Sequence, residues 1–257
     1  MNTPAVMVLV KNEAFWLPYT LVQTEGIFDR YVIYDVGSTD GTKEIIEWWV
    51  ERMKGKPVDI FTRLLPHCEP AIQGTFRNSM IAEGMRDSYF LLDGDELYSP
   101  RDMFKIRDAA TILRTVNEES PRLRYGVVQR TEVTNDLMYA YKEARTHHRL
   151  YMKDAWWTGT HPGEAPWFAQ HDKSQSHFPD IMCWHMHNTL RSASETEVPG
   201  RIKRKSQRSY HPGNEKEPLG LKLLDTIPLL RKPIEQFAVN PALQLLQDDY
   251  AKLQSSR

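Results

Sequence analysis

Short apolar runs alternate with amphipathic stretches along the first hundred residues of the chain. The runs end at polar or acidic residues, which is typical of strands buried on both faces of a sheet. We therefore predict strands at residues 5–10, 31–34, 58–61 and 89–92. Apolar residues at helical spacing lie between these runs and predict helices at residues 14–24, 45–53 and 75–85.

This alternation of strands and helices is the pattern of parallel βαβ units. Ligands bind to such sheets beyond the carboxyl ends of the strands. The polar residues that follow three of the predicted strands, at 11–13, 35 and 93–95, are therefore expected to lie along one edge of the sheet.

The second half of the chain has a looser pattern. Ser99 and Pro100 are the N-cap and first residue of a predicted helix that runs to residue 116. Strands are predicted at residues 125–129 and 149–152. After residue 218 the apolar periodicity is interrupted by prolines, so we expect short helices packed on the body; the prolines are Pro228, Pro233 and Pro241.

The chain has 257 residues, of which 40% are hydrophobic, 33 are Lys or Arg and 34 are Asp or Glu. These values fit one folded domain, or one with a small appendage, and exclude a disordered chain. The near-neutral charge gives no reason to expect nucleic-acid binding. No stretch approaches the roughly 18 to 20 apolar residues that cross a bilayer, and the N-terminus lacks a signal peptide pattern. With only Cys68 and Cys183, we expect a soluble cytoplasmic protein without a transmembrane anchor.

Asp93-Gly94-Asp95 is the strongest local indication of chemistry in the sequence. It directly follows an apolar strand, and two carboxylates at this spacing can share one divalent cation and its bound phosphates. A solvated turn is the alternative interpretation, because Asp-x-Asp is common by chance.

The Asp-Gly-Asp turn belongs to a series of four motifs in the same part of the chain. Together they resemble the nucleotide-binding half of glycosyltransferase family 2, which has the GT-A fold. The motifs are Val10-Lys11-Asn12-Glu13, Asp35-Val36-Gly37-Ser38-Thr39-Asp40-Gly41-Thr42, Arg77-Asn78 and Asp93-Gly94-Asp95-Glu96. One departure is Val36, where many relatives have a second acid or an Asn. Taken alone, residues 37–42 also fit a turn that caps the next helix.

The resemblance implies an α/β fold of the GT-A, Rossmann-like type. It predicts a mixed, mainly parallel sheet flanked by helices, followed by a helical C-terminal extension. Residues 1–97 would be the nucleotide-sugar-binding half and residues 98–192 the acceptor-binding, catalytic half of the same domain. Residues 193–257 would be a basic segment and a helical tail.

The resemblance also implies roles for individual residues at the donor site. Val10, Asn12, Glu13 and Asp35 would hold the nucleobase, with Asp35 accepting a hydrogen bond from an N–H of uracil. Arg77 would reach the base or the diphosphate from its helix. UDP is therefore the expected carrier, with GDP and dTDP as alternatives.

The same resemblance assigns the metal site. Asp93 would contact the ribose or the metal's water shell, and Asp95 would ligate the metal. His185 and His187 would share one face if their segment is a strand, and the family's fold often supplies a late histidine ligand. His185 fits that role first and His187 second. Imidazole beside a carboxylate favours Mn²⁺ over Mg²⁺, which prefers oxygen ligands. A strand with two histidines and no metal is the alternative.

Residues 149–164 resemble a family segment that precedes the acceptor site. Glu164 is the predicted base that deprotonates the acceptor hydroxyl, and His161 is the second candidate. Pro162 and Gly163 separate the two, unlike the adjacent His-Glu pair of the family. The acceptor can stack on nearby tryptophans, Trp156 and Trp157 first, although buried core positions are equally consistent with their sequence context.

These features predict a metal-dependent glycosyltransferase that moves a sugar from a nucleotide-sugar donor to a saccharide or other hydroxyl acceptor, with inversion. A sugar-1-phosphate nucleotidyltransferase is an alternative, but residues 11–13 lack the glycines of its first loop. A non-catalytic sugar-binding relative is the other. The basic segment 201–208 can be a lid over the diphosphate, a contact for anionic lipid or nucleic acid, or a solvated helix face.

Overall fold

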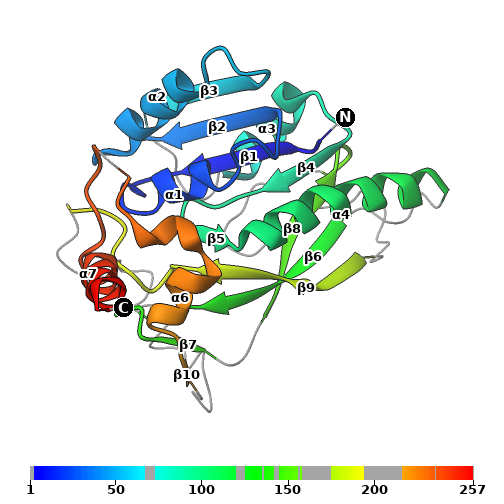
Figure 1. The fold of residues 1–257 in the computed structure, drawn as a ribbon. Coiled ribbons are helices and arrows are strands. Elements are labelled where there is room, and N and C mark those ends of the chain that lie inside the picture. The colour runs from blue at the N-terminus through cyan, green and yellow to red at the C-terminus, as the bar shows by residue number, and fades with distance from the viewer. Residues whose placement is uncertain are drawn as a thin grey trace, which may run out of the picture.

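An eight-stranded mixed sheet lies at the centre of the structure and carries helices on both faces (Figure 1). The computed structural model describes residues 3–66, 73–119, 125–134, 136–141, 145–155, 157, 175–193, 216–234 and 236–256. Within these residues the strand order is β3-β2-β1-β4-β8-β6-β9-β5, and β7 pairs with β10 in a separate two-stranded sheet.

Four pairs of neighbouring strands in the large sheet are parallel and three are antiparallel. The predicted mixed α/β sheet is therefore confirmed. The strands are β1 Ala5–Val10, β2 Arg30–Val36, β3 Asp59–Leu65, β4 Ser88–Leu91, β5 Glu96–Tyr98, β6 Tyr125–Glu132, β7 Tyr139–Tyr141, β8 Arg145–Met152, β9 Gln175–His185 and β10 Lys216–Pro218.

The helices divide between the two faces because side chains alternate along the strands. Val6, Val8 and Val10 of β1 face the helices α1, α2 and α4, whereas Ala5 and Met7 face α3. The helices are α1 Leu17–Val22, α2 Thr42–Met53, α3 Gln73–Gly84, α4 Pro100–Glu119, α6 Leu221–Thr226, the 3₁₀-helix η2 Pro228–Arg231 and α7 Pro241–Ser255. None of the helices in the described part of the chain is long and apolar enough to span a bilayer.

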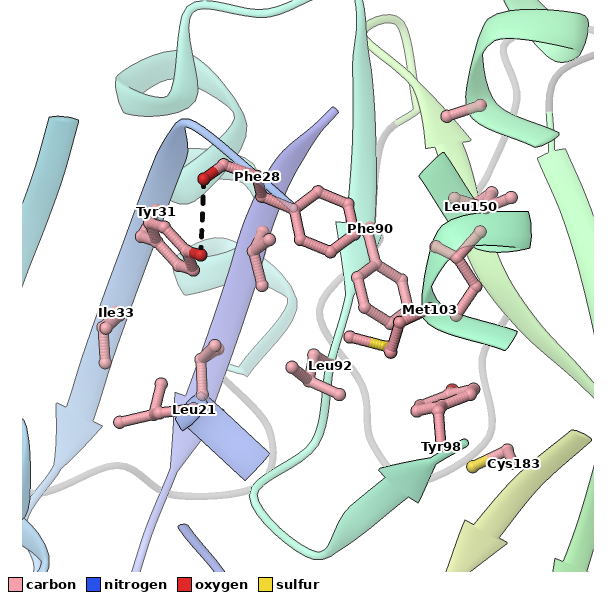
Figure 2. Packing of buried hydrophobic residues seen from close by; sticks show 14 of the residues in the cluster. Leu21, Phe28, Tyr31, Ile33, Phe90, Leu92, Tyr98, Met103, Leu150 and Cys183 are labelled. Carbon is pink, nitrogen blue, oxygen red and sulfur yellow. Dashed lines mark hydrogen bonds between the residues drawn. The ribbon is translucent and has the colours of Figure 1, made fainter. Parts of the chain in front are cut away.

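Aromatic residues fill the larger of the apolar layers, between the sheet and the helices α1, α2 and α4. The rings of Phe28 and Phe90 lie 5.8 Å apart, and Tyr98 meets Phe90 edge-on at 5.7 Å (Figure 2). Tyr98 brings β5 into this core, beside the buried Cys183 of β9. Because β5 has only three residues, the packing of Tyr98 at its carboxyl end also restrains the turn that precedes it.

Several elements differ from the predicted ones. The first helix is shorter than 14–24, because Glu13 O accepts from the backbone of Trp16 and Leu17 in a turn before it. The fourth helix continues three residues beyond 116, to Glu119. The strands β5 and β7 were not predicted, since three residues carry too short a pattern to distinguish from a loop. The last helix, α7, has 15 residues and is longer than the short helices expected there.

Candidate active site

Three predicted metal ligands meet at one edge of the sheet. Asp95 precedes β5, and His185 ends β9, the strand that pairs with β5. The backbone N–H of Met186 donates to Asp95 O at 2.8 Å, which fixes the two segments against each other. Asp95, His185 and His187 are all buried, and one ligand atom from each lies within 4.8 Å of the others. The structure therefore brings a carboxylate together with two imidazoles that lie some 90 residues further along the sequence.

A glycine lets this turn approach the first motif of the chain. A Cβ atom at Gly94 would lie 2.8 Å from Val10 Cγ1 and 2.9 Å from Glu13 Cγ, which is too close for carbon atoms. The side chain of Val10 is itself part of the core. Gly94 is thus required where the turn after β4 packs on the residues that follow β1.

The electrostatics of the site favour an ionised carboxylate. Burial works to raise the pKa of Asp95, but Arg191, His185 and His187 hold it well below its usual range. Burial also works against charge on His185, yet Asp95 and Glu132 raise its pKa to about 9. His185 Nε2 lies 3.5 Å from Asp95 Oδ1, and its Nδ1 lies 3.8 Å from Glu132 Oε1. A metal ion that bound here would have to displace the proton of His185.

Arg191 is a part of this cluster that the sequence did not reveal. Its guanidinium donates to Glu13 Oε1, to Asp95 Oδ2 at 2.8 Å, and contacts His187 Nδ1 at 3.1 Å. It joins the first motif of the chain to the metal-ligand set across 178 residues of sequence. Nothing in the segment around Arg191 gives a pattern that would have predicted this.

A second buried arginine, Arg149 of β8, orients the other acids of the turn. It donates to Asp93 Oδ2 at 2.6 Å and, through Nε, to Glu96 Oε1 at 3.0 Å. Glu96 is fully buried, whereas the side chain of Asp93 is 31% exposed. Burial works to raise the pKa of Asp93, but Arg149 holds it below its usual value. Asp93 is therefore an ionised carboxylate that is held by Arg149 and is partly accessible to solvent.

The loops after β1 and β2 are tied together by side-chain hydrogen bonds. Asp35 Oδ1 accepts from Ser38 N at 3.0 Å and from Ser38 Oγ at 2.6 Å. Ser38 Oγ in turn accepts from Asn12 N at 2.9 Å, and Asn12 Oδ1 accepts from Thr39 N at 2.8 Å. Glu13 N donates to Thr42 Oγ1 at 2.9 Å. Side-chain hydrogen bonds thus hold Asn12, Glu13 and Asp35, three of the predicted donor-site residues, at the carboxyl ends of β1 and β2.

Arg77 of α3 lies close enough to Asp93 for its positive charge to contribute to the lowered pKa of that carboxyl. Its guanidinium lies over the ring of Trp157, 5.8 Å from the centroid. The neighbouring Asn78 fixes Trp157 by donating to its carbonyl oxygen at 2.8 Å and accepting from its N–H at 2.9 Å. Trp157 is 4% exposed, and its ring packs edge-on against Tyr151.

Several predicted residues lie outside the described part of the chain. They are the candidate bases Glu164 and His161, the candidate acceptor residue Trp156 and the basic segment 201–208. Their roles stay predictions.

No protein-family model matches the sequence, and no curated protein matches it. Among solved structures, the chain is similar to a mannosyltransferase, PcManGT from Pyrobaculum calidifontis in complex with GDP-Man and Mn²⁺, at a TM-score of 0.50. The two are 15% identical, and the match covers 98% of this chain and 80% of that one.

This chain has a GT-A-like fold. It is also similar to TarS of S. aureus, residues 1–349, with a TM-score of 0.47 and 14% identity over 72% of this chain. The chain spans 60% of that structure and 36% of a longer TarS structure.

Proposed function

We propose that the protein is a metal-dependent glycosyltransferase that transfers a sugar from a nucleoside diphosphate donor to an acceptor hydroxyl. A UDP-sugar is the first candidate for the donor, and the transfer inverts the configuration of the sugar. The observation that carries this proposal is the position of Asp95, His185 and His187. They form a buried set of one carboxylate and two imidazoles beside the Asn12 and Asp35 loops, at the edge of the sheet where such folds bind ligands.

The donor set fits a divalent cation. One carboxylate with two imidazoles suits a transition-type ion such as Mn²⁺ better than Mg²⁺, which favours oxygen ligands. The solved structure of the mannosyltransferase of similar fold is a complex with GDP-Man and Mn²⁺. Asp95, His185 and His187 would hold the cation, which would supply positive charge for the departing nucleoside diphosphate.

The remaining residues bind and orient the substrates. The fixed loop of Asn12 and Asp35 would receive the nucleobase, and Arg77 would neutralise charge on the diphosphate from the side of Trp157. Asp93, oriented by Arg149, would accept hydrogen bonds from the ribose. Glu164 remains the proposed base for the acceptor hydroxyl, with His161 as the alternative.

Calorimetric titration of UDP, GDP and dTDP, each with and without Mn²⁺, tests the proposal. We expect UDP to bind in a Mn²⁺-dependent manner and Asp95→Ala to abolish this dependence. Asp108→Ala, which removes an exposed carboxylate of α4, is the matched control and should bind like the wild type. Absence of nucleoside diphosphate binding under all conditions, or full metal-dependent activity in Asp95→Asn, would contradict the proposal.

A further inference from the structure

Arg191 places a permanent positive charge against the metal-ligand set. We propose that this charge keeps the affinity of the site for a divalent cation low until a nucleoside diphosphate is bound, so that cation and nucleotide bind as a pair. The inference rests on the proposed function, because it concerns the same site. It assigns to Arg191 an electrostatic role that neither its place in the sequence nor the fold comparison suggests.

The contacts of Arg191 put its charge at the ligands themselves. Its guanidinium hydrogen-bonds Asp95 at 2.8 Å and contacts His187 Nδ1 at 3.1 Å, so two of the three ligands touch it. Arg191 is only 5% exposed, which leaves little solvent to screen the charge. Arginine does not lose its proton in proteins, so this charge is present at every accessible pH.

Three hydrogen bonds hold the backbone around Arg191. Its carbonyl oxygen accepts from Phe15 N at 2.7 Å. The carbonyl oxygen of Leu190 accepts from Trp16 Nε1 at 3.0 Å and from Asn240 Nδ2 at 2.9 Å. Arg191 is therefore anchored by the start of α1 and by the residue that precedes α7, and its charge stays near the site.

The balance of charges follows from this arrangement. The single positive charge of Arg191 offsets one of the two negative charges of Glu13 and Asp95 before any cation enters. A divalent cation at Asp95, His185 and His187 adds two positive charges beside a third, and like charges this close in a buried site repel strongly. A diphosphate brings several negative charges to the same place and removes that penalty. By linkage, the cation must strengthen nucleotide binding by the same factor.

A comparison of two substitutions at Arg191 tests the inference. Arg191→Gln removes the charge and keeps a hydrogen-bonding side chain, whereas Arg191→Lys keeps the charge and loses the planar fork. Binding of Mn²⁺ alone can be monitored through the loss of the electron paramagnetic resonance signal of the free ion. The affinity for Mn²⁺ should increase by roughly tenfold or more in Arg191→Gln. It should stay within about twofold of the wild type in Arg191→Lys. The factor by which Mn²⁺ strengthens UDP binding, measured by calorimetry, should shrink in Arg191→Gln.

The outcomes separate the inference from the proposed function. Unchanged or weaker Mn²⁺ binding in Arg191→Gln overturns the inference, and so does equal tightening in both variants, since the effect would then not come from charge. Micromolar binding of Mn²⁺ alone to the wild-type protein also overturns the inference. This outcome is measured on the wild-type protein and does not depend on whether a variant folds. Failure of UDP to bind the wild-type protein contradicts the proposed function, whereas the series with Mn²⁺ alone still decides the role of Arg191.

Discussion

At the scale of single residues, two buried arginines hold the acids of the Asp-Gly-Asp-Glu turn in place. Arg149 holds Asp93 and Glu96, and Arg191 holds Asp95 together with Glu13. Removing a charge from water is costly unless it is paired, so these acids can be buried only because the arginines accompany them. The turn therefore presents ionised carboxylates in fixed directions instead of a solvated, mobile acidic loop.

Substitution of Arg149 by Met should leave Glu96 buried without its cation. We expect the free energy of unfolding to fall by about 3–5 kcal/mol, the usual loss when one partner of a buried ion pair is removed. Arg107→Met in α4, which breaks an exposed pair with Asp108, should cost less than about 1 kcal/mol. Urea denaturation of both variants at neutral pH measures the difference. Equal losses would show that the Arg149 cluster contributes no more than a surface pair.

The sequence predicted the acids and histidines of the site but neither arginine. Asp93 and Asp95 follow an apolar strand, and His185 and His187 stand two residues apart, so each pair carries a local pattern. In the structure β9 ends at His185, and His187 lies in the turn that follows rather than on the strand. Arg149 and Arg191 are single charged residues whose acidic partners lie 53 to 178 residues away in the chain. A contact across that distance is fixed by the order of strands in the sheet, and a local pattern does not contain this order.

At the scale of elements, the pairing of β5 with β9 brings Asp95 close to His185 and His187. The strands β1, β2 and β4 could be predicted because each contains an apolar run that ends at polar residues. The strand β5 could not, because its three residues follow an acidic turn and contain Glu96. Its register, Glu96 opposite His185, is nevertheless what brings Asp95 to the histidines.

Asn240 links the last helix to the site and offers a test at this scale. Its Oδ1 accepts from Ala242 N at 2.9 Å as the N-cap of α7, and its Nδ2 donates to Leu190 O. Asn240→Ala should lose both functions and lower the free energy of unfolding by about 2 kcal/mol. Asn240→Asp keeps the cap and should lose about 1 kcal/mol or less. Chemical denaturation distinguishes the two, and identical losses would mean that the cap contributes nothing.

At the scale of the whole molecule, the C-terminal segment completes a core that begins near the N-terminus. Phe15, Trp16 and Tyr19, around the start of α1, pack with buried residues of the segment from 216 onward. These buried residues are Leu219, Leu223, Leu224, Ile227, Leu230, Leu243 and Leu246. Because Trp16 also holds the backbone beside Arg191, this second core supports one side of the site.

Removal of residues 216–257 tests whether this tail belongs to the same folding unit as the rest of the chain. The predicted boundary after residue 192 would instead make the tail an addition to that unit. Each buried Leu or Ile contributes about 1.5–3 kcal/mol, so seven together are comparable with the roughly 5–15 kcal/mol that stabilise a whole domain. We expect the shortened chain to lose its cooperative thermal transition in calorimetry. A chain ending at residue 252 loses only exposed positions of the described helix and should melt within about 2 °C of the full chain. If the chain ending at residue 215 still melted cooperatively near the temperature of the full chain, the tail would be a separate unit. The support that it gives to Arg191 through Asn240 would then be dispensable.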